Sequence, residues 1–208
     1  MNLPAAAVAF GAAFLAGSIP TAYLLVKILK GKDIRTMGSG NAGATNVFRC
    51  VGFKEGLAAL LLDAAKGAVP VLIFTHRPDP IPAVHPDVYG FLLALTAILG
   101  HVFTPFLGFK GGKGVAVGAG VATALYPWNF LVAFMVWAVV LAATRYMSLA
   151  SLLGTYTFAI VSFLTPQSLP VRGLCILAAF FITWTHRSNI RRLLKGEELR
   201  LNINRKNS

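Results

Sequence analysis

The chain has 208 residues, of which 56% are hydrophobic and only 12% are charged. Soluble domains of this length carry about a quarter charged residues, so the composition excludes an ordinary soluble domain. The remaining charge is lopsided, with 19 Lys and Arg residues against 7 Asp and Glu and a formal net charge of +12. Because the basic residues fall between long apolar runs, we attribute the excess to membrane insertion and expect no nucleic-acid binding.

The positions of the two cysteines and the first apolar run argue against a disulfide, a zinc site and a signal peptide. Cys50 and Cys175 lie far apart and belong to no CxxC or Cys/His cluster, so we expect neither a disulfide nor a zinc site. The apolar run at residues 3–26 has no basic residue before it and no convincing small-residue cleavage site. We therefore interpret this run as a retained membrane span and not as a signal peptide.

Seven apolar runs follow one another along the chain. A helix crosses the bilayer core with about 20 apolar residues, so the runs predict an all-α membrane bundle of about seven transmembrane helices, with five or six as the alternative. No repeat or linker interrupts them, which predicts a single domain over residues 1–208. One run is short and glycine-rich, and whether it spans fully or is re-entrant stays open. The runs are 3–26, 56–74, 88–107, 114–127 (the short one), 128–144, 147–164 and 168–184.

The distribution of basic residues predicts the orientation. With the N-terminus outside and the C-terminus cytoplasmic, 16 of the 19 basic residues lie on the inner side, as the positive-inside rule requires. Only Arg77 and Arg172 then lie outside, and Lys66 lies within a span. The proline-rich loop at residues 75–87 is nearly neutral. We expect this loop outside and residues 31–55, 108–114 and 185–208 inside.

The first polar segment on the inner side, residues 31–49, has the composition of an anion-binding loop. Its glycines permit tight turns that expose backbone N–H groups, its short polar side chains add donors, and arginines flank it. A plain turn between helices rarely needs so many donors. The glycines are Gly38, Gly40 and Gly43, the donors are Ser39, Asn41, Thr45 and Asn46, and the arginines are Arg35 and Arg49.

The second segment, residues 100–116, places Lys110 and Lys113 among Gly108, Gly111, Gly112 and Gly114, directly before an apolar helix. Backbone amides and a helix N-terminus attract an anion. The pattern is one residue shorter than a Walker A loop, and glycine occupies the place of the magnesium-binding Ser or Thr. We therefore predict phosphate binding without a nucleotide–magnesium site. His101 precedes the loop, and both a core role and a functional role stay open for it.

The third segment, residues 185–200, follows the last run. Its basic residues fit a stop-transfer tail or an interfacial helix that places Ile190, Leu193 and Leu194 in the membrane. That interpretation leaves His186 and Asn189 unexplained, which share one helical face. Within the second run, Asp63 and Lys66 also stand three residues apart, and structural pairing and a supporting role beneath the site are equally open.

Together these segments closely resemble the bacterial acyl-phosphate:glycerol-3-phosphate acyltransferase family, the membrane-integral enzymes that open phospholipid synthesis. The likeness runs nearly from end to end. It is carried by GSIPTAYLL (17–25), GSGNAGATNV (38–47), LDAAKGA (62–68), GHVFTPFLGFKGGKGVA (100–116), RYMSLAS (145–151) and the tail THRSNIRRLLKGEE.

The resemblance implies transfer of a fatty acyl group from acyl phosphate to the 1-hydroxyl of glycerol-3-phosphate, giving lysophosphatidic acid without a cofactor or metal. It implies a multi-pass protein of the bacterial cytoplasmic (inner) membrane, surrounded by membrane lipids, with its active site on the cytoplasmic face. It also implies that a soluble enzyme supplies the acyl phosphate and that a further acyltransferase takes the product. With the residue patterns above, it predicts catalytic Ser39, Arg49, His186 and Asn189, substrate-binding Asn41, Asn46, Lys110, Gly111, Gly112, Lys113 and Gly114, and supporting Asp63, Lys66 and Glu198.

Acyl-group chemistry supports an activated donor. The four histidines never stand in the His-x4-Asp pattern that soluble-facing acyltransferases of this pathway use. Acyl phosphate is a mixed anhydride whose phosphate leaves readily once its charge is held, so positioning and charge stabilisation carry most of the rate. His186 and a substrate phosphate are both candidates for the base.

Two other classes were weighed. A transporter for an organic phosphate predicts inverted repeats and broken helices; no repeat is found, although residues 17–20 interrupt the first run. A P-loop ATPase is disfavoured by the shortened loop and the missing Ser or Thr.

Overall fold

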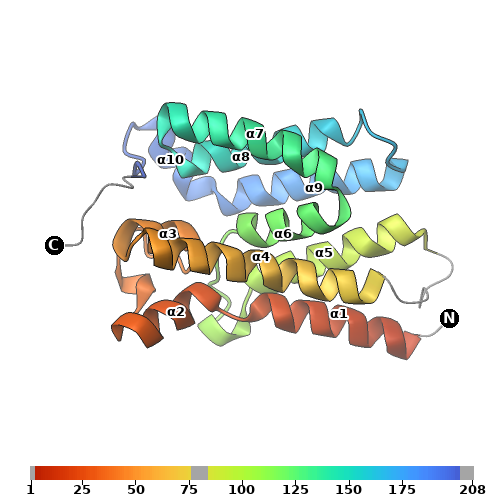
Figure 1. Cartoon of the computed structure of the whole chain (residues 1–208), viewed down its shortest axis with the longest axis horizontal. Helices are drawn as coiled ribbons and strands as arrows, with labels where there is room; N and C mark the ends of the chain where they lie inside the picture. Colours follow the sequence, from red (N-terminus) through yellow and green to blue (C-terminus); the bar gives the residue numbers. More distant parts are fainter. Residues whose placement is uncertain (1–2, 76–83, 202–208) are drawn as a thin grey trace. The chain divides into compact units, whose positions relative to one another are not determined.

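A computed structural model of the chain describes residues 3–75 and 84–201, and all regular structure within these residues is helical. The described residues form two compact units, one up to Leu125 and the other from Tyr126 onward. Figure 1 labels α1 to α6 in unit 1 and α7 to α10 in unit 2. The all-helical fold predicted from the sequence is confirmed.

Unit 1 consists of three long helices and several shorter ones. Within it, α1 lies beside α5 and α4 beside α6, while the short α3 packs on α4 (Figure 1). The first apolar run is broken between Ser18 and Thr21, where Pro20 has no N–H to continue a helix. The elements are α1 (Leu3–Ser18), α2 (Thr21–Lys30), the 3-10 turn η1 (Ile34–Thr36), α3 (Ala44–Cys50), α4 (Phe53–Thr75), α5 (Pro86–Val102), the 3-10 turn η2 (Pro105–Leu107) and α6 (Val115–Leu125).

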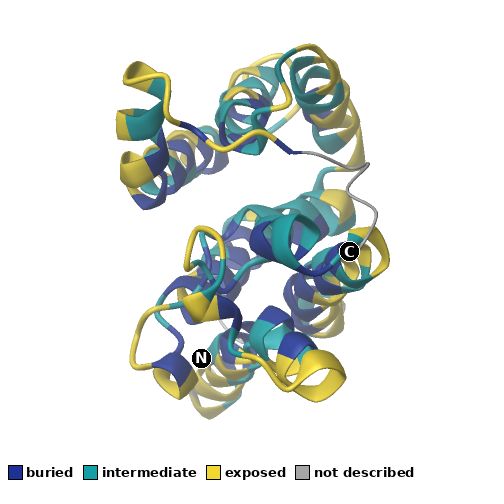
Figure 2. Ribbon diagram, turned by 90° about the vertical axis from the view of Figure 1, so that its left-hand side faces the viewer, coloured by how far each residue is buried: buried dark blue, intermediate teal, exposed yellow. Residues whose placement is uncertain are grey.

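Glycines bring α1 and α5 into main-chain contact. A Cβ on Gly17 would overlap the carbonyl of Ala97, and a Cβ on Gly100 would overlap the carbonyl of Phe14. Buried residues lie on the inner sides of the helices and exposed residues on the outer sides (Figure 2), and Ala13 of α1 and Ala97 of α5 are among the buried ones. Because lipid tails are as apolar as leucine, association of membrane helices depends on such close packing of small residues.

Helices α4 and α6 are also in main-chain contact through glycines, with one glycine on each helix. Gly120 of α6 lies against the carbonyl of Ala64, and Gly67 of α4 lies against the carbonyl of Val117, 2.6 Å from where its Cβ would stand. A Cβ on Gly118, also in α6, would lie 3.6 Å from the side chain of Ile98, which is an ordinary van der Waals distance. Close contact is therefore required at Gly120 and not at Gly118.

Unit 2 contains α7 (Pro127–Thr144), α8 (Met147–Val161), α9 (Leu169–Thr185) and α10 (Arg187–Leu194). Helix α8 packs against both α7 and α9. The axis bends by 64° between α9 and α10. After α10 the chain returns to the α7–α8 turn, where the Leu201 N–H donates to the Arg145 carbonyl at 2.8 Å.

Every predicted apolar run contains a helix, but not every helix is long enough to cross a bilayer. Among the described residues, four stretches are sufficiently long and apolar, and a fifth is added if α9 and α10 form one bent span. The 11 residues of α6 rise about 16 Å, roughly half of a 30 Å core. The seven-span count therefore stays a prediction. The four stretches are Pro4–Lys30, Phe53–Thr75, Pro86–Leu107 and Pro127–Thr144.

We predict opposite responses to alanine at the two glycines of α6. Gly120→Ala should lower the free energy of unfolding by about 1–3 kcal/mol, because its Cβ overpacks against the α4 main chain. Gly118→Ala should leave it unchanged or raise it by up to about 1 kcal/mol, because alanine favours a helix more than glycine does. Thermal unfolding of both purified variants in detergent measures the difference; equal midpoints would contradict the packing described for α6.

Candidate functional site

The loop at residues 38–43, here the SGN loop, is shaped by the buried amide of Asn46. This amide donates to the carbonyls of Ile34 and Met37 at 3.1 and 2.9 Å and accepts from the Ser39 N–H at 3.0 Å. Gly38 and Gly40 both have positive φ, which favours glycine. The amide of Asn46 thus holds the loop, and its contact with substrate stays a prediction. Ser39 lies exposed.

A buried apolar cluster supports the SGN loop from below. Val26 of α2, Ile34 of η1, Val47 of α3 and Leu107 of η2 belong to this one cluster. Arg49, predicted to be catalytic, lies half-buried in the last turn of α3. The loop and the helix that carries Arg49 therefore rest on the same core.

Residues 108–114, here the glycine-lysine loop, connect α5 to α6 through unusual backbone conformations. Gly108 and Gly114 have φ of 62° and 87°, and Phe109 has φ of 61°. A left-handed phenylalanine is strained, and such strain is concentrated at functional sites. Helix α6 begins directly after Gly114, so its N-terminal N–H groups and its dipole favour an anion beside the loop.

The two lysines of this loop differ in exposure. Lys113 is half-buried between the buried Gly112 and Gly114, whereas Lys110 is exposed. A charge interacts more strongly with an anion where water is partly excluded. Of the two, Lys113 is therefore better placed to bind a phosphate.

The structure brings the first two predicted segments together. The Asn41 amide of the SGN loop donates to the Gly111 carbonyl of the glycine-lysine loop at 3.4 Å, across 70 positions of sequence. The sequence placed both segments on one side of the membrane but gave no evidence that they touch. Two loops suited to anions are therefore neighbours within unit 1.

A buried polar cluster lies beneath these loops. The Lys66 ammonium lies 2.7 Å from the Asp63 carboxylate and donates to the Ile19 carbonyl at 2.6 Å. The Thr21 hydroxyl also donates to Asp63, and the His101 Nδ1 lies 3.7 Å from the same carboxylate. The sequence left structural pairing of Asp63 with Lys66 and a supporting role beneath the site equally open, and the structure shows the pair. Thr21 and His101 were missed as partners, because nothing in sequence links positions so far apart.

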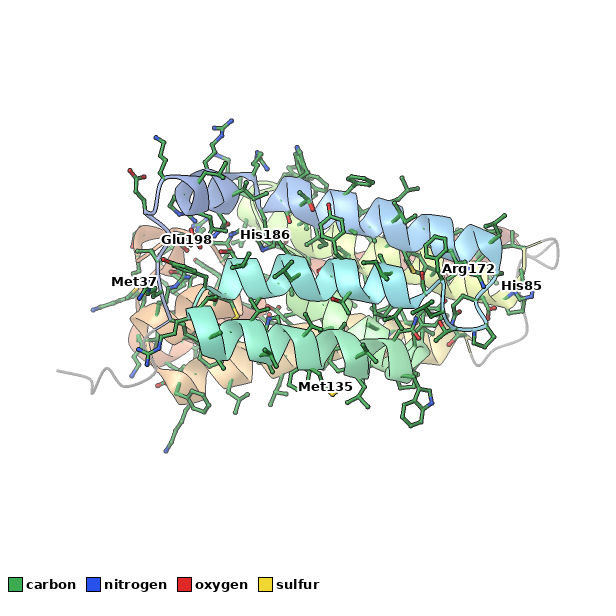
Figure 3. All side chains as sticks on the ribbon, turned by 90° about the horizontal axis from the view of Figure 1, so that it is seen from above. Met37, His85, Met135, Arg172, His186 and Glu198 are labelled. Carbon is green, nitrogen blue, oxygen red and sulfur yellow. The ribbon has the colours of Figure 1, made fainter. Side chains whose placement is uncertain are left out.

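In unit 2, His186 and Asn189 lie buried at the junction of α9 and α10. His186 Nδ1 is 2.8 Å from the Ile182 carbonyl. A carbonyl only accepts hydrogen bonds, so in the neutral ring Nδ1 carries the proton and Nε2 carries the lone pair. Figure 3 shows His186 and Glu198 at the same end of this unit, with Arg172 at the other end.

Glu198 organises this end of unit 2. Its carboxylate accepts from Asn189 at 2.6 Å, from Ser148 at 2.9 Å and from Arg192 at 2.7 Å. Burial tends to raise the pKa of the Glu198 carboxyl, but these three hydrogen bonds outweigh burial and hold the pKa below its ordinary value. Ser148 lies 50 positions before Glu198, and sequence reasoning gave it no role.

The predicted site residues thus fall into two groups, one in each unit. Among the residues that the structure describes, no three or more His, Cys, Asp or Glu side chains are grouped to hold a metal ion. The fold and the loops define an integral-membrane helical protein with neighbouring anion-suited loops.

Comparisons with known proteins agree. The sequence model of the family described as glycerol-3-phosphate acyltransferase matches residues 7–196, a range that runs through both units. A glycerol-3-phosphate acyltransferase of Anaeromyxobacter dehalogenans is 44% identical over 195 residues, covering 92% of this chain and 95% of the relative. One of Myxococcus xanthus is 44% identical over 187 residues, covering 90% and 95%.

Two solved structures are similar over 95% of this chain and 96% of theirs. Both are of PlsY (YgiH), described as an integral membrane glycerol 3-phosphate acyltransferase. The glycerol 3-phosphate form is 38% identical with a TM-score of 0.85, and the lysophosphatidic acid form is 36% identical with a TM-score of 0.82. The chain belongs to the glycerol-3-phosphate acyltransferase family. The family and the enzyme class predicted from the sequence are confirmed.

Proposed function

We propose that this enzyme transfers a fatty acyl group from acyl phosphate to the 1-hydroxyl of glycerol-3-phosphate and releases lysophosphatidic acid and phosphate. The observation that carries the proposal is the contact between Asn41 and Gly111, which joins two anion-suited loops. A reaction between two substrates that each bear a phosphate needs two such loops side by side. The similar structures, one a glycerol 3-phosphate form and one a lysophosphatidic acid form, support the acceptor and the product.

In the proposed reaction the 1-hydroxyl oxygen attacks the acyl carbon. An ester bond forms, the bond from the acyl carbon to the phosphate oxygen breaks, and inorganic phosphate leaves with the electron pair. The hydroxyl proton passes to a base. Because the mixed anhydride is already activated, the protein contributes positioning and stabilisation of the leaving charge.

Each loop is assigned one phosphate. Lys113, with Gly111, Gly112 and Gly114, holds the phosphate of glycerol-3-phosphate, where the α6 N-terminus adds favourable dipole charge. Exposed Ser39 and half-buried Arg49 act on the acyl phosphate. Asn41 joins the loops, and Asn46 shapes the SGN loop from within.

The residues of unit 2 complete the assignment. With Nδ1 donating to the Ile182 carbonyl, His186 offers Nε2 as a base, and a substrate phosphate is the alternative. Glu198 fixes Asn189 through a charge-assisted hydrogen bond of 2.6 Å. The role of Glu198 is therefore to hold Asn189 in place three residues after His186.

We further assign the enzyme to the bacterial cytoplasmic membrane in one multi-pass domain with seven spans, its N-terminus outside and its site on the cytoplasmic face. The distribution of basic residues supports this orientation. Acyl phosphate then comes from a soluble enzyme on the same face, and a further acyltransferase takes the lipid product.

The simplest test of the proposed function compares product formation from two acyl donors. Purified protein incubated with radiolabelled glycerol-3-phosphate should yield lysophosphatidic acid with acyl phosphate and little with acyl-CoA, because two loops suited to phosphates match a phosphate donor. A Gly114→Pro variant, which removes a backbone N–H and the positive φ, provides the inactive control. Comparable turnover with acyl-CoA at matched concentration would overturn the donor assignment.

Kinetics separate the two loops. A charge-assisted contact contributes about 1.5–3 kcal/mol, so Lys113→Ala should raise KM for glycerol-3-phosphate about tenfold or more with a smaller change in kcat. Lys54→Ala, at an exposed lysine outside both loops, is the control, because exposed charges contribute under about 1 kcal/mol. Ser39→Ala should lower kcat and spare that KM, since charge builds on the leaving phosphate in the transition state. The reverse pattern would mean that the loops are assigned to the wrong substrates.

Cysteine labelling tests the topology in a variant whose two native cysteines are replaced. A membrane-impermeant reagent added outside intact cells should label Asp87→Cys and spare Lys32→Cys and Lys195→Cys, all at exposed positions. Breaking the cells should expose the latter two. Labelling of either lysine position in intact cells would contradict the proposed orientation. The loop at residues 76–83, where Arg77 was predicted to lie outside, falls outside the described residues.

A further inference from the structure

His101 lies directly behind the glycine-lysine loop. Its imidazole Nε2 occupies the place where a Cβ on Gly112 would stand. Gly112 does not have positive φ, so its backbone conformation suits other residues. Glycine is therefore required at position 112 by contact with the histidine ring, and the missing side chain points into the protein and not toward a bound phosphate.

The last turn of α5 also holds the main chain of this loop. The Gly111 N–H donates to the Val102 carbonyl at 3.0 Å, and the Gly112 N–H donates to the His101 carbonyl at 3.3 Å. A Cβ on Gly111 would overlap the same His101 carbonyl. Two adjacent glycines thus rest on one histidine, Gly111 on its main chain and Gly112 on its ring.

Nδ1, on the opposite side of the imidazole, faces the buried polar cluster. It lies 3.7 Å from the Asp63 carboxylate, which is fixed by Lys66 and Thr21. Asp63 is 1% exposed, Lys66 8% and His101 6%. Buried charges in a membrane protein are costly and mark functional positions. Pairing alone accounts for Asp63 and Lys66, but it does not account for a histidine ring between their cluster and the loop.

We propose that His101 is a positioning residue, which sets the distance between α5 and Gly112 and so fixes the cradle for the phosphate of glycerol-3-phosphate. The proposal rests on the function assigned above to the glycine-lysine loop. His101 acts through Gly112 and is not assigned contact with the reacting atoms. Asp63 lies beside the ring, and Lys66 and Thr21 hold Asp63 in place.

A double-mutant cycle tests the contact between ring and loop. In the wild-type background Gly112→Ala should raise KM for glycerol-3-phosphate about tenfold or more, because the new Cβ meets the imidazole and displaces the loop. In a His101→Ala background the ring is gone, and Gly112→Ala should raise KM by less than about threefold. Gly111→Ala is the matched control: its Cβ meets main chain, so it should raise KM by the same factor in both backgrounds.

Further measurements separate positioning from general stability. His101→Ala alone should raise KM for glycerol-3-phosphate while leaving KM for acyl phosphate unchanged. His101→Gln, which places an amide nitrogen near the position of Nε2, should restore most of the lost affinity. A purely structural role for His101 would lower the amount of folded protein and change both KM values alike, and that result would overturn the inference.

The outcomes distinguish this inference from the proposed function. If Gly112→Ala raises KM for glycerol-3-phosphate by the same factor in both backgrounds, the positioning role is wrong. The same holds if His101→Ala reduces the effect of Gly111→Ala on KM as much as it reduces the effect of Gly112→Ala. Either result leaves the acyltransferase assignment untouched. If the wild-type protein makes no lysophosphatidic acid, the proposed function fails. The contact between His101 and Gly112 is then still decided by the thermal unfolding midpoints of the same purified variants.

Discussion

Unit 1 depends on satisfying one buried carboxylate. Asp63 lies on the apolar helix α4 and is buried, with 1% of its surface exposed. An unpaired charge is strongly unfavourable in such surroundings. Lys66 supplies the opposite charge from the same helix and Thr21 donates a hydroxyl from the start of α2, while the His101 imidazole, from the end of α5, lies 3.7 Å from the carboxylate. The broken first span is part of this arrangement, since the interruption frees the Ile19 carbonyl that accepts from Lys66. These contacts join α2 to α4 at the level of the end of α5, from which the glycine-lysine loop emerges.

From this level the site is built mainly of main chain. The glycine-lysine loop is bound to the carbonyls of Val102 and His101, and the SGN loop is bound to the amide of Asn46. These bonds engage the N–H groups of Gly111, Gly112 and Ser39 and so hold the shape of both loops, while the first N–H groups of α6, beside Lys113, face an anion with little reorganisation. An activated acyl donor suits such a site, because its phosphate leaves readily once its charge is held. Unit 2 applies the same principle with a side chain: Glu198 gathers Asn189, Arg192 and Ser148 around one carboxylate.

The sequence predicted what depends on local pattern. Apolar runs located the helices, the spacing of Asp63 and Lys66 gave pairing as one of two open roles, and glycines around Lys113 located the second loop. It could not predict contacts between distant positions, such as Asn41 with Gly111 or Ser148 with Glu198, because these depend on how helices pack. Asn46 shows the limit within a motif, since a side chain with donors suits a substrate and a loop carbonyl equally well. The break at Pro20 and the short α6 show why apolar length alone did not settle the number of spans.

The proposed function depends on recognition of phosphate by the neighbouring loops of unit 1. Equilibrium binding of glycerol-3-phosphate to the purified enzyme without acyl donor, measured by calorimetry beside glycerol and inorganic phosphate, tests it most directly. We expect saturable binding of glycerol-3-phosphate, its displacement by inorganic phosphate and no measurable binding of glycerol. Lys113→Ala should weaken the affinity for glycerol-3-phosphate about tenfold or more. Glycerol binding as tightly as glycerol-3-phosphate, or Lys113→Ala binding as tightly as the wild type, would contradict it.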